Sequence, residues 1–214
     1  MTDSETPGTA APDDDAAPAP KWQERDAWTA LDDLDASPVL VPASEWPAGA
    51  EGVDRPGLFG LWVDEAGAVE LARGLDLPLE AGRIWIGQAG ATKWPSGRAS
   101  SDTLGDRIAR THLNGRVRSS TIRLTLAGIL FVQLDLVVQA SALLQASAEQ
   151  DLSDWMSAHL SIAVHPHDDR DSLAGLEQGI AQRLDPPLNI DGYLPATSVR
   201  QSVIALRRRI SREG

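Results

Sequence analysis

The sequence contains no cysteine and only one tyrosine, Tyr193. The absence of cysteine excludes a disulfide framework, a thiolate nucleophile and a cysteine-ligated zinc site. No long apolar run is present either: the longest, residues 124–138, is interrupted by polar side chains and is too short to span a bilayer. The first residues lack the positive and apolar regions of a signal peptide. We therefore expect a soluble, cytoplasmic protein with no membrane partner.

Positive charge is scarce overall, because the 214 residues carry a formal net charge of −12. The charge is unevenly distributed. Residues 1–37 hold ten acidic and two basic side chains, whereas residues 93–123 hold seven basic and two acidic ones. The basic segment predicts a surface for a polyanion, although arginines that merely solvate helix faces remain the alternative.

Composition also predicts where the folded domain begins and ends. Residues 1–37 are expected to be an acidic disordered tail. Within it, the apolar side chains of Trp22, Trp28, Leu31 and Leu34 indicate a short amphipathic segment that can dock on the domain. The domain itself is expected over residues 38–192, followed by a basic C-terminal helix over 193–214.

Apolar runs separated by turn residues predict an α/β fold. It would be a small mixed or antiparallel three-stranded sheet flanked by helices. The expected strands are 58–63, 83–88 and 160–165, and the expected helices cover 104–112, the residues after Ser120, those around Trp155, 172–184 and 200–212. Residues 39–41 are a further candidate edge strand.

Three segments carry the chemical argument. They are Pro56-Gly57-Leu58-Phe59, Ile84-Trp85-Ile86-Gly87 and the helical stretch from Leu176 to the closing Pro186-Pro187-Leu188-Asn189. Together they resemble the GIY-YIG nuclease family over about residues 56–190. The resemblance implies that the closing residues 186–189 tether the helix to the sheet. The segments 88–98 and 119–126 are similar to a bacterial branch of standalone members.

The resemblance implies a divalent ion, Mg²⁺ or Mn²⁺, held by Glu177, and a DNA phosphate contacted by Arg107. A single carboxylate can hold Mg²⁺ because this ion keeps several waters, and a guanidinium forks onto two phosphate oxygens. The alternatives are an ordinary surface glutamate and an arginine paired with Asp106 or another acid. The cluster His165-Pro166-His167-Asp168-Asp169 has metal-ligand composition, but it is more typical of a turn after a strand.

The family's other site positions differ here. Phe59 and Trp85 stand where the two tyrosines belong, and neither side chain can act as a base. His112 corresponds to a downstream histidine or tyrosine, but it follows Arg107 by five residues instead of four, a rotation of about 140° in an α-helix. We expect Phe59 to border the same pocket as Glu177 and Arg107. The remaining residues expected to bind DNA are Lys93, Arg98, Arg110, Arg116, Arg118, Arg123 and Asn189.

The function indicated is a metal-dependent endonuclease that hydrolyses DNA phosphodiester bonds. A catalytically degenerate module of the same fold, which binds nucleic acid or regulates, is the second hypothesis. A partner-binding domain that shares only the fold is the third.

Overall fold

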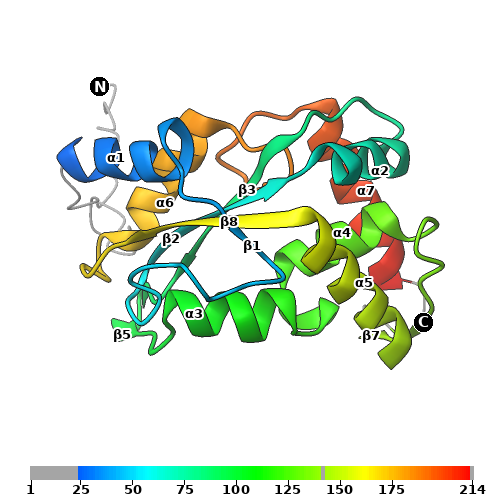
Figure 1. Cartoon of the computed structure of the whole chain (residues 1–214), viewed down its shortest axis with the longest axis horizontal. Coiled ribbons are helices and arrows are strands. Elements are labelled where there is room, and N and C mark those ends of the chain that lie inside the picture. Colours follow the sequence, from blue (N-terminus) through cyan, green and yellow to red (C-terminus); the bar gives the residue numbers. More distant parts are fainter. Residues whose placement is uncertain (1–23, 141–142, 213–214) are drawn as a thin grey trace, which may run out of the picture.

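The computed structural model describes residues 24–140 and 143–212. Its centre is an antiparallel sheet in the order β1-β8-β2-β3 (Figure 1). The strands are β1 (Val41–Pro42), β2 (Gly57–Val63), β3 (Gly82–Ala89) and β8 (Leu160–Pro166). In β2, which lies between β8 and β3, Phe59 is opposite Gly87 of β3 and Val164 of β8. The predicted α/β class with helices around an antiparallel sheet is confirmed, and the short β1 adds a fourth strand.

The sheet is covered on both faces, which explains why β2 is apolar along its whole length. Leu58 and Ile86 point to one face and pack with the side chains of α1 and α6. Phe59, Leu61 and Trp85 point to the larger core on the other face. Figure 1 shows α1 and α6 on one side of the sheet and α3 on the other. The α-helices are α1 (Glu24–Leu31), α2 (Glu65–Leu75), α3 (Leu104–Asp106), α4 (Thr121–Leu130), α5 (Ala146–His159), α6 (Leu173–Leu184) and α7 (Ser198–Arg212).

The remaining elements are short. Two π-helices, η1 (Asp32–Ala36) and η2 (Arg107–Leu113), continue α1 and α3, and η3 (Val117–Ser119) is a 3₁₀ turn. Two small hairpins are formed by β4 (Thr92–Lys93) with β5 (Arg98–Ala99), and by β6 (Val138–Ala140) with β7 (Leu143–Leu144). No helix among the described residues is long and apolar enough to cross a membrane.

The N-terminal segment differs from the prediction. Residues 24–36 form α1 and η1 instead of a disordered tail, while residues 1–23 lie outside the described part. Leu34 is fully buried between the helix and the sheet. The carboxylate of Asp33 lies 2.8 Å from Nδ1 of His165, and Asp35 forms an ion pair with Arg83. The segment therefore docks on the domain, but through Ala27, Ala30 and Leu34 rather than through the whole predicted face: Trp28 is 62% exposed, and Trp22 lies outside the described residues. Burial of these apolar side chains stabilises the helix.

The C-terminal helix is part of the core. It begins at residue 198, inside the predicted region 193–214 and two residues before the predicted helix 200–212, and packs on α4 with Val203 and Ile210 buried. Arg200 is only 3% exposed, because its guanidinium donates to the backbone oxygen of Asn189 and to a carboxylate oxygen of Asp185, both at 2.7 Å. This arginine therefore anchors α7 and does not belong to a basic surface.

Candidate active site

The central feature of the candidate site is a carboxylate inside the apolar stripe of α6. Leu173, Leu176 and Ile180 of this helix are fully buried against the sheet, and Glu177 lies between them, half-buried. No described residue donates a hydrogen bond to Glu177 or forms an ion pair with it. Burial first, and then the negative charge of Asp191, raise the pKa of the Glu177 carboxyl from 4.5 to about 7. Glu177 is therefore a largely desolvated carboxylate without a cationic partner among the described residues.

Two residues beyond the helix, Asp191 and Tyr193, lie close enough to Glu177 to interact with it, and neither was predicted from the sequence as a site residue. Asp191 follows the turn after α6, and the side chain of Tyr193 interacts with its carboxylate. Burial first, and then the charges of Glu177 and Asp191, raise the pKa of Tyr193, so its phenol keeps its proton. The signal was present, because Tyr193 is the chain's only tyrosine and lies four residues after the motif asparagine.

The turn that carries these residues is fixed to the sheet by Asn189. Its side-chain oxygen accepts from the backbone nitrogen of Ile86, and its amide nitrogen donates to the backbone oxygen of Ile86, both at 2.9 Å. These two bonds occupy the outer edge of β3 as another strand would. The amide nitrogen also lies 3.3 Å from a carboxylate oxygen of Asp191. Asn189 is 1% exposed, so the prediction that it binds DNA is wrong, whereas the predicted tether between helix and sheet is present.

Arg107, the predicted phosphate ligand, lines a separate cleft that reaches α6 at Ala174. Its side chain is 39% exposed, and its only described carboxylate partner, Asp102, is 3.5 Å away. It lines a cleft of about 180 Å³ that also includes Gln88, Thr92, Lys93, Asp102 and Ala174. Ala174 precedes Glu177 by three residues and lies on the same face of α6. The structure therefore leaves Arg107 accessible beside the helix that carries Glu177.

The five-residue spacing from Arg107 to His112 is explained by the π-helix. In η2 the backbone hydrogen bonds run from residue i to i+5, as from the nitrogen of Asn114 to the oxygen of Ala109 at 3.0 Å. Residues five apart therefore lie one turn above each other. The charge of Arg107 acts on His112 accordingly, as one of the causes that lower the pKa of His112.

The interior position of His112 removes it from direct chemistry. Its ring is 6% exposed, its Nδ1 lies 2.9 Å from the hydroxyl of Ser120, and it contacts the ring of Phe59 at a centroid distance of 5.3 Å. Burial, followed by the charges of Arg107 and Arg123, lowers its pKa to about 3. His112 is neutral at physiological pH and does not reach the surface, so its assignment as a catalytic group is wrong.

Phe59 and Trp85 also belong to the core. They are 1% and 8% exposed and pack in one apolar cluster. The ring of Phe59 lies against Gly87, where a Cβ atom would come within 2.7 Å of its Cζ. The expectation that Phe59 borders the pocket is therefore wrong. The two positions where the family has tyrosines are therefore filled by apolar rings that pack in the core beneath β2 and β3.

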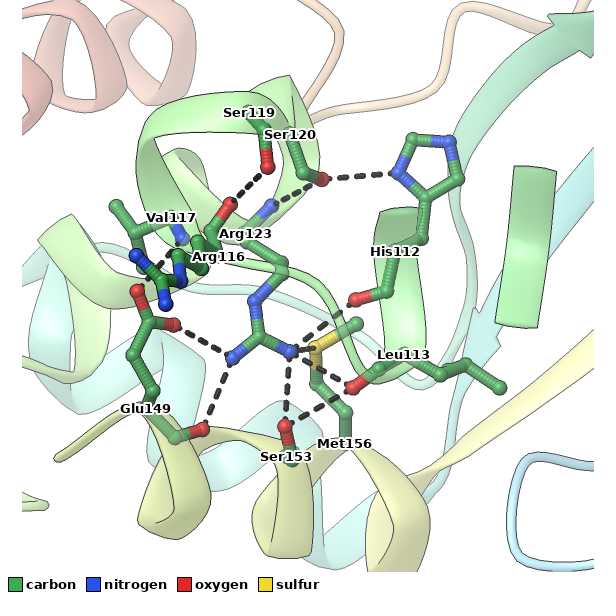
Figure 2. A network of polar contacts seen from close by, with 10 residues as sticks. All are labelled: His112, Leu113, Arg116, Val117, Ser119, Ser120, Arg123, Glu149, Ser153 and Met156. Atoms are coloured by element: carbon green, nitrogen blue, oxygen red, sulfur yellow. Dashed lines mark hydrogen bonds and ion pairs between the residues drawn. The ribbon is translucent and has the colours of Figure 1, made fainter. Parts of the chain in front are cut away.

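Arg123 is the second predicted DNA ligand that the structure places inside. It is 0% exposed and forms the centre of the polar network in Figure 2. Its Nη2 donates to Oε2 of Glu149 at 2.8 Å, and its Nη1 donates to the backbone oxygens of Leu113 and His112 at 2.8 and 3.2 Å. Arg123 therefore joins α4 and α5 to the end of the helix that carries Arg107, and its prediction as a substrate ligand is wrong.

The other predicted DNA-binding cations are at the surface. Lys93, Arg98, Arg110, Arg116 and Arg118 are all exposed. Arg110 pairs with Asp106 at 3.2 Å, one turn apart on the helix. The cluster at residues 165–169 ends β8 and has separate partners: His165 contacts Asp33, and Asp168 contacts Arg55. In the described part of the chain, no group of three or more His, Cys, Asp or Glu side chains is arranged to hold a metal ion.

These features describe a small α/β domain with a half-buried carboxylate on α6 and an accessible arginine that lines a cleft. The sequence profile of the GIY-YIG catalytic domain matches residues 84–209, more than half of the chain. The chain belongs to the GIY-YIG nuclease family. The matched region begins in β3 and does not include β2. The family match therefore says nothing about β2, and its pairing with β3 is known only from the structure. Neither the curated proteins nor the solved structures include a significant match.

Proposed function

We propose that this protein is a metal-dependent endonuclease that hydrolyses phosphodiester bonds in DNA. The observation that carries the proposal is the environment of Glu177. This residue is half-buried and has no cationic partner among the described residues, and burial together with the charge of Asp191 raises the pKa of its carboxyl to about 7. Leaving a carboxylate in this position costs stability unless a cation binds there. The family membership supports the same class of activity.

The donor chemistry fits Mg²⁺ or Mn²⁺. Glu177 supplies a carboxylate oxygen, and Asp191 adds a second negative charge nearby. Hard divalent ions take oxygen ligands and keep waters in their remaining positions. When bound, such an ion would neutralise charge on the phosphoryl oxygens and lower the pKa of a water.

The chain's own residues position the substrate and hold protons. Arg107 is accessible in the cleft and suits a bidentate contact to a phosphate. Tyr193 keeps its proton, so its hydroxyl acts as a donor in the site. Lys93 adds positive charge in the cleft beside Arg107.

The second candidate, a catalytically degenerate module that binds nucleic acid, is favoured by the burial of Phe59 and Trp85. With no phenol in either motif, the family's strand residues offer no base. Both candidate functions require exposed cations such as Lys93 and Arg98 to bind nucleic acid. Only the nuclease requires the carboxylate of Glu177.

A cleavage assay separates the two. Plasmid and branched DNA are incubated with the full chain and Mg²⁺ or Mn²⁺, alongside Glu177→Ala and Glu65→Ala. Glu65 is an exposed glutamate on α2 and serves as the control. We expect metal-dependent cleavage by the wild type and by Glu65→Ala, and none by Glu177→Ala. Equal cleavage by all three proteins would refute the role of Glu177, and DNA binding without cleavage would favour the degenerate module.

A further inference from the structure

The hairpin β4–β5 combines three features that neither the fold nor the cleft explains. It projects next to the cleft and ends in a four-residue tip from Trp94 to Gly97. Trp94 is 45% exposed, and no ring or guanidinium group of the described residues stacks on it. Lys93 and Arg98 flank the tip on either side, and both are exposed.

The two cations face each other. Lys93 and Arg98 are direct partners across the hairpin, and like charges in that relation are destabilising. No described carboxylate lies within ion-pair distance of either side chain. The hairpin is therefore arranged to receive an anion that the chain itself does not supply.

The base of the hairpin is held firmly, so its tip is presented in a fixed direction. Thr92 donates through its hydroxyl to Asp171 at 2.7 Å. Arg170 donates to the backbone oxygens of Gly90 and Ser100 at 2.7 and 2.6 Å, which closes both ends of the loop. At the tip, the Ser96 hydroxyl donates to the backbone oxygen of Lys93 at 2.9 Å. A contact made here loses little conformational entropy on binding.

The hairpin is continuous with the candidate active site. Lys93 lines the same cleft as Arg107, so a strand whose phosphate lies at Arg107 passes the hairpin. An exposed aromatic ring between two cations is the combination with which proteins hold unstacked nucleotides: the ring stacks on a base and the cations contact the backbone.

We propose that the β4–β5 hairpin is a DNA-binding finger, in which Trp94 stacks on an unpaired base while Lys93 and Arg98 bind the flanking phosphates. The inference rests on the proposed function and names its substrate class: DNA that presents an unstacked base, either single-stranded or as a distorted duplex. A fully paired duplex offers phosphates to the two cations but no base to the indole.

The test measures binding of the full chain in EDTA by fluorescence anisotropy, so that no cleavage intervenes. The probes are a single-stranded oligonucleotide, a duplex with one unpaired base and the same duplex fully paired. Loss of one stacked base weakens binding about 5- to 150-fold. Trp94→Ala is expected to show this loss on one or both of the first two probes, and little change on the paired duplex. Which of the two probes responds identifies the source of the base.

Three further variants serve as controls. Trp94→Phe keeps a stacking ring and is expected to retain most of the affinity. Lys93→Gln and Arg98→Gln should weaken all probes alike and reduce the salt dependence by about one phosphate contact each. Trp28→Ala removes a more exposed indole, 62% exposed on α1, and should change nothing.

The outcomes separate the two proposals. If the wild type binds DNA and Trp94→Ala binds every probe equally well, the finger is refuted and the nuclease proposal stands. If Trp94→Ala loses affinity equally on all three probes, base stacking is refuted in favour of a general backbone contact. If the wild type binds none of the probes, both proposals fail.

Discussion

Arg123 and Glu149 form an ion pair at 2.8 Å in which the arginine side chain is completely buried. The pair also satisfies backbone groups: Glu149 accepts from the nitrogen of Val117 at 2.9 Å, and Arg123 donates to the carbonyls that end η2. Each partner thus neutralises the other while closing the end of one helix and the start of the next. Removing one partner leaves a buried charge without compensation.

The first prediction is that Arg123→Gln lowers the free energy of unfolding by about 3–5 kcal/mol. Arg118→Gln, at an exposed position five residues earlier, is the control, and a surface change of this kind stays within about 0.5 kcal/mol. Urea denaturation of both variants measures the difference. If Arg123→Gln instead weakens DNA binding at unchanged stability, the residue is a DNA ligand after all.

The sequence predicted the parts of the fold that local patterns encode. The apolar runs located the three long strands, because burial follows periodicity. The place of Glu177 among the apolar residues of its helix indicated that it lies near the buried edge, whereas its role as a metal ligand is implied by the family resemblance. The tether formed by the closing residues 186–189 was implied by the family resemblance and not by a local pattern, and Asn189 itself was predicted to bind DNA.

The errors came from relationships that no local pattern encodes. An arginine is usually exposed, and the burial of Arg123 depends on Glu149, 26 residues away. The amino-acid composition of residues 107–113 does not distinguish a π-helix from an α-helix. We therefore assumed α-helical geometry for the spacing of Arg107 and His112, whereas the segment is a π-helix. The position of Asp191 and Tyr193 beside Glu177 depends on the path of the chain after α6.

The second prediction concerns pH. Because the folded protein holds the Glu177 proton more tightly than the unfolded chain, the contribution of Glu177 to the free energy of unfolding falls as pH rises from 4.5 to about 7. Relative to the wild type without metal, Glu177→Gln should therefore become more stable across this interval. Asp191→Asn should keep only part of the pH dependence, since burial of Glu177 remains. Chemical denaturation at a series of pH values tests this, and parallel curves for wild type and Glu177→Gln would contradict it.

The third prediction concerns metal binding independently of cleavage. A ligand that binds only the folded state raises the free energy of unfolding, by about 2.7 kcal/mol at one hundred times its dissociation constant. Mg²⁺ or Mn²⁺ should therefore raise the Tm of the wild type above pH 7 and leave that of Glu177→Gln unchanged. Equal stabilisation of both proteins would place the metal elsewhere.

The fourth prediction concerns Phe59, which was expected to border the pocket and lies in the core instead. Its ring is 1% exposed and lies against His112 and Gly87, so Phe59→Tyr places a hydroxyl in the core. Unless that group finds a partner, the variant should lose about 1–3 kcal/mol of stability. Cleavage should not increase. An active, fully stable Phe59→Tyr protein would show that the hydroxyl reaches the site and that Phe59 replaces a working tyrosine.

The fifth prediction tests the π-helix as the device that accommodates the extra residue between Arg107 and His112. Deleting Arg110, which is exposed and paired only with Asp106, should convert η2 to an α-helix while the residues on either side keep their directions. His112 would still meet Ser120, so the Tm should change little.

Deleting Asp151, an exposed residue in the middle of α5, is the matched control. There the following residues rotate by about 100°, which turns Trp155 and Met156 away from the core. We expect this control to lose most of its stability in thermal unfolding. If both deletions destabilise the protein equally, then η2 carries no extra residue, and the neighbouring positions of Arg107 and His112 have another cause.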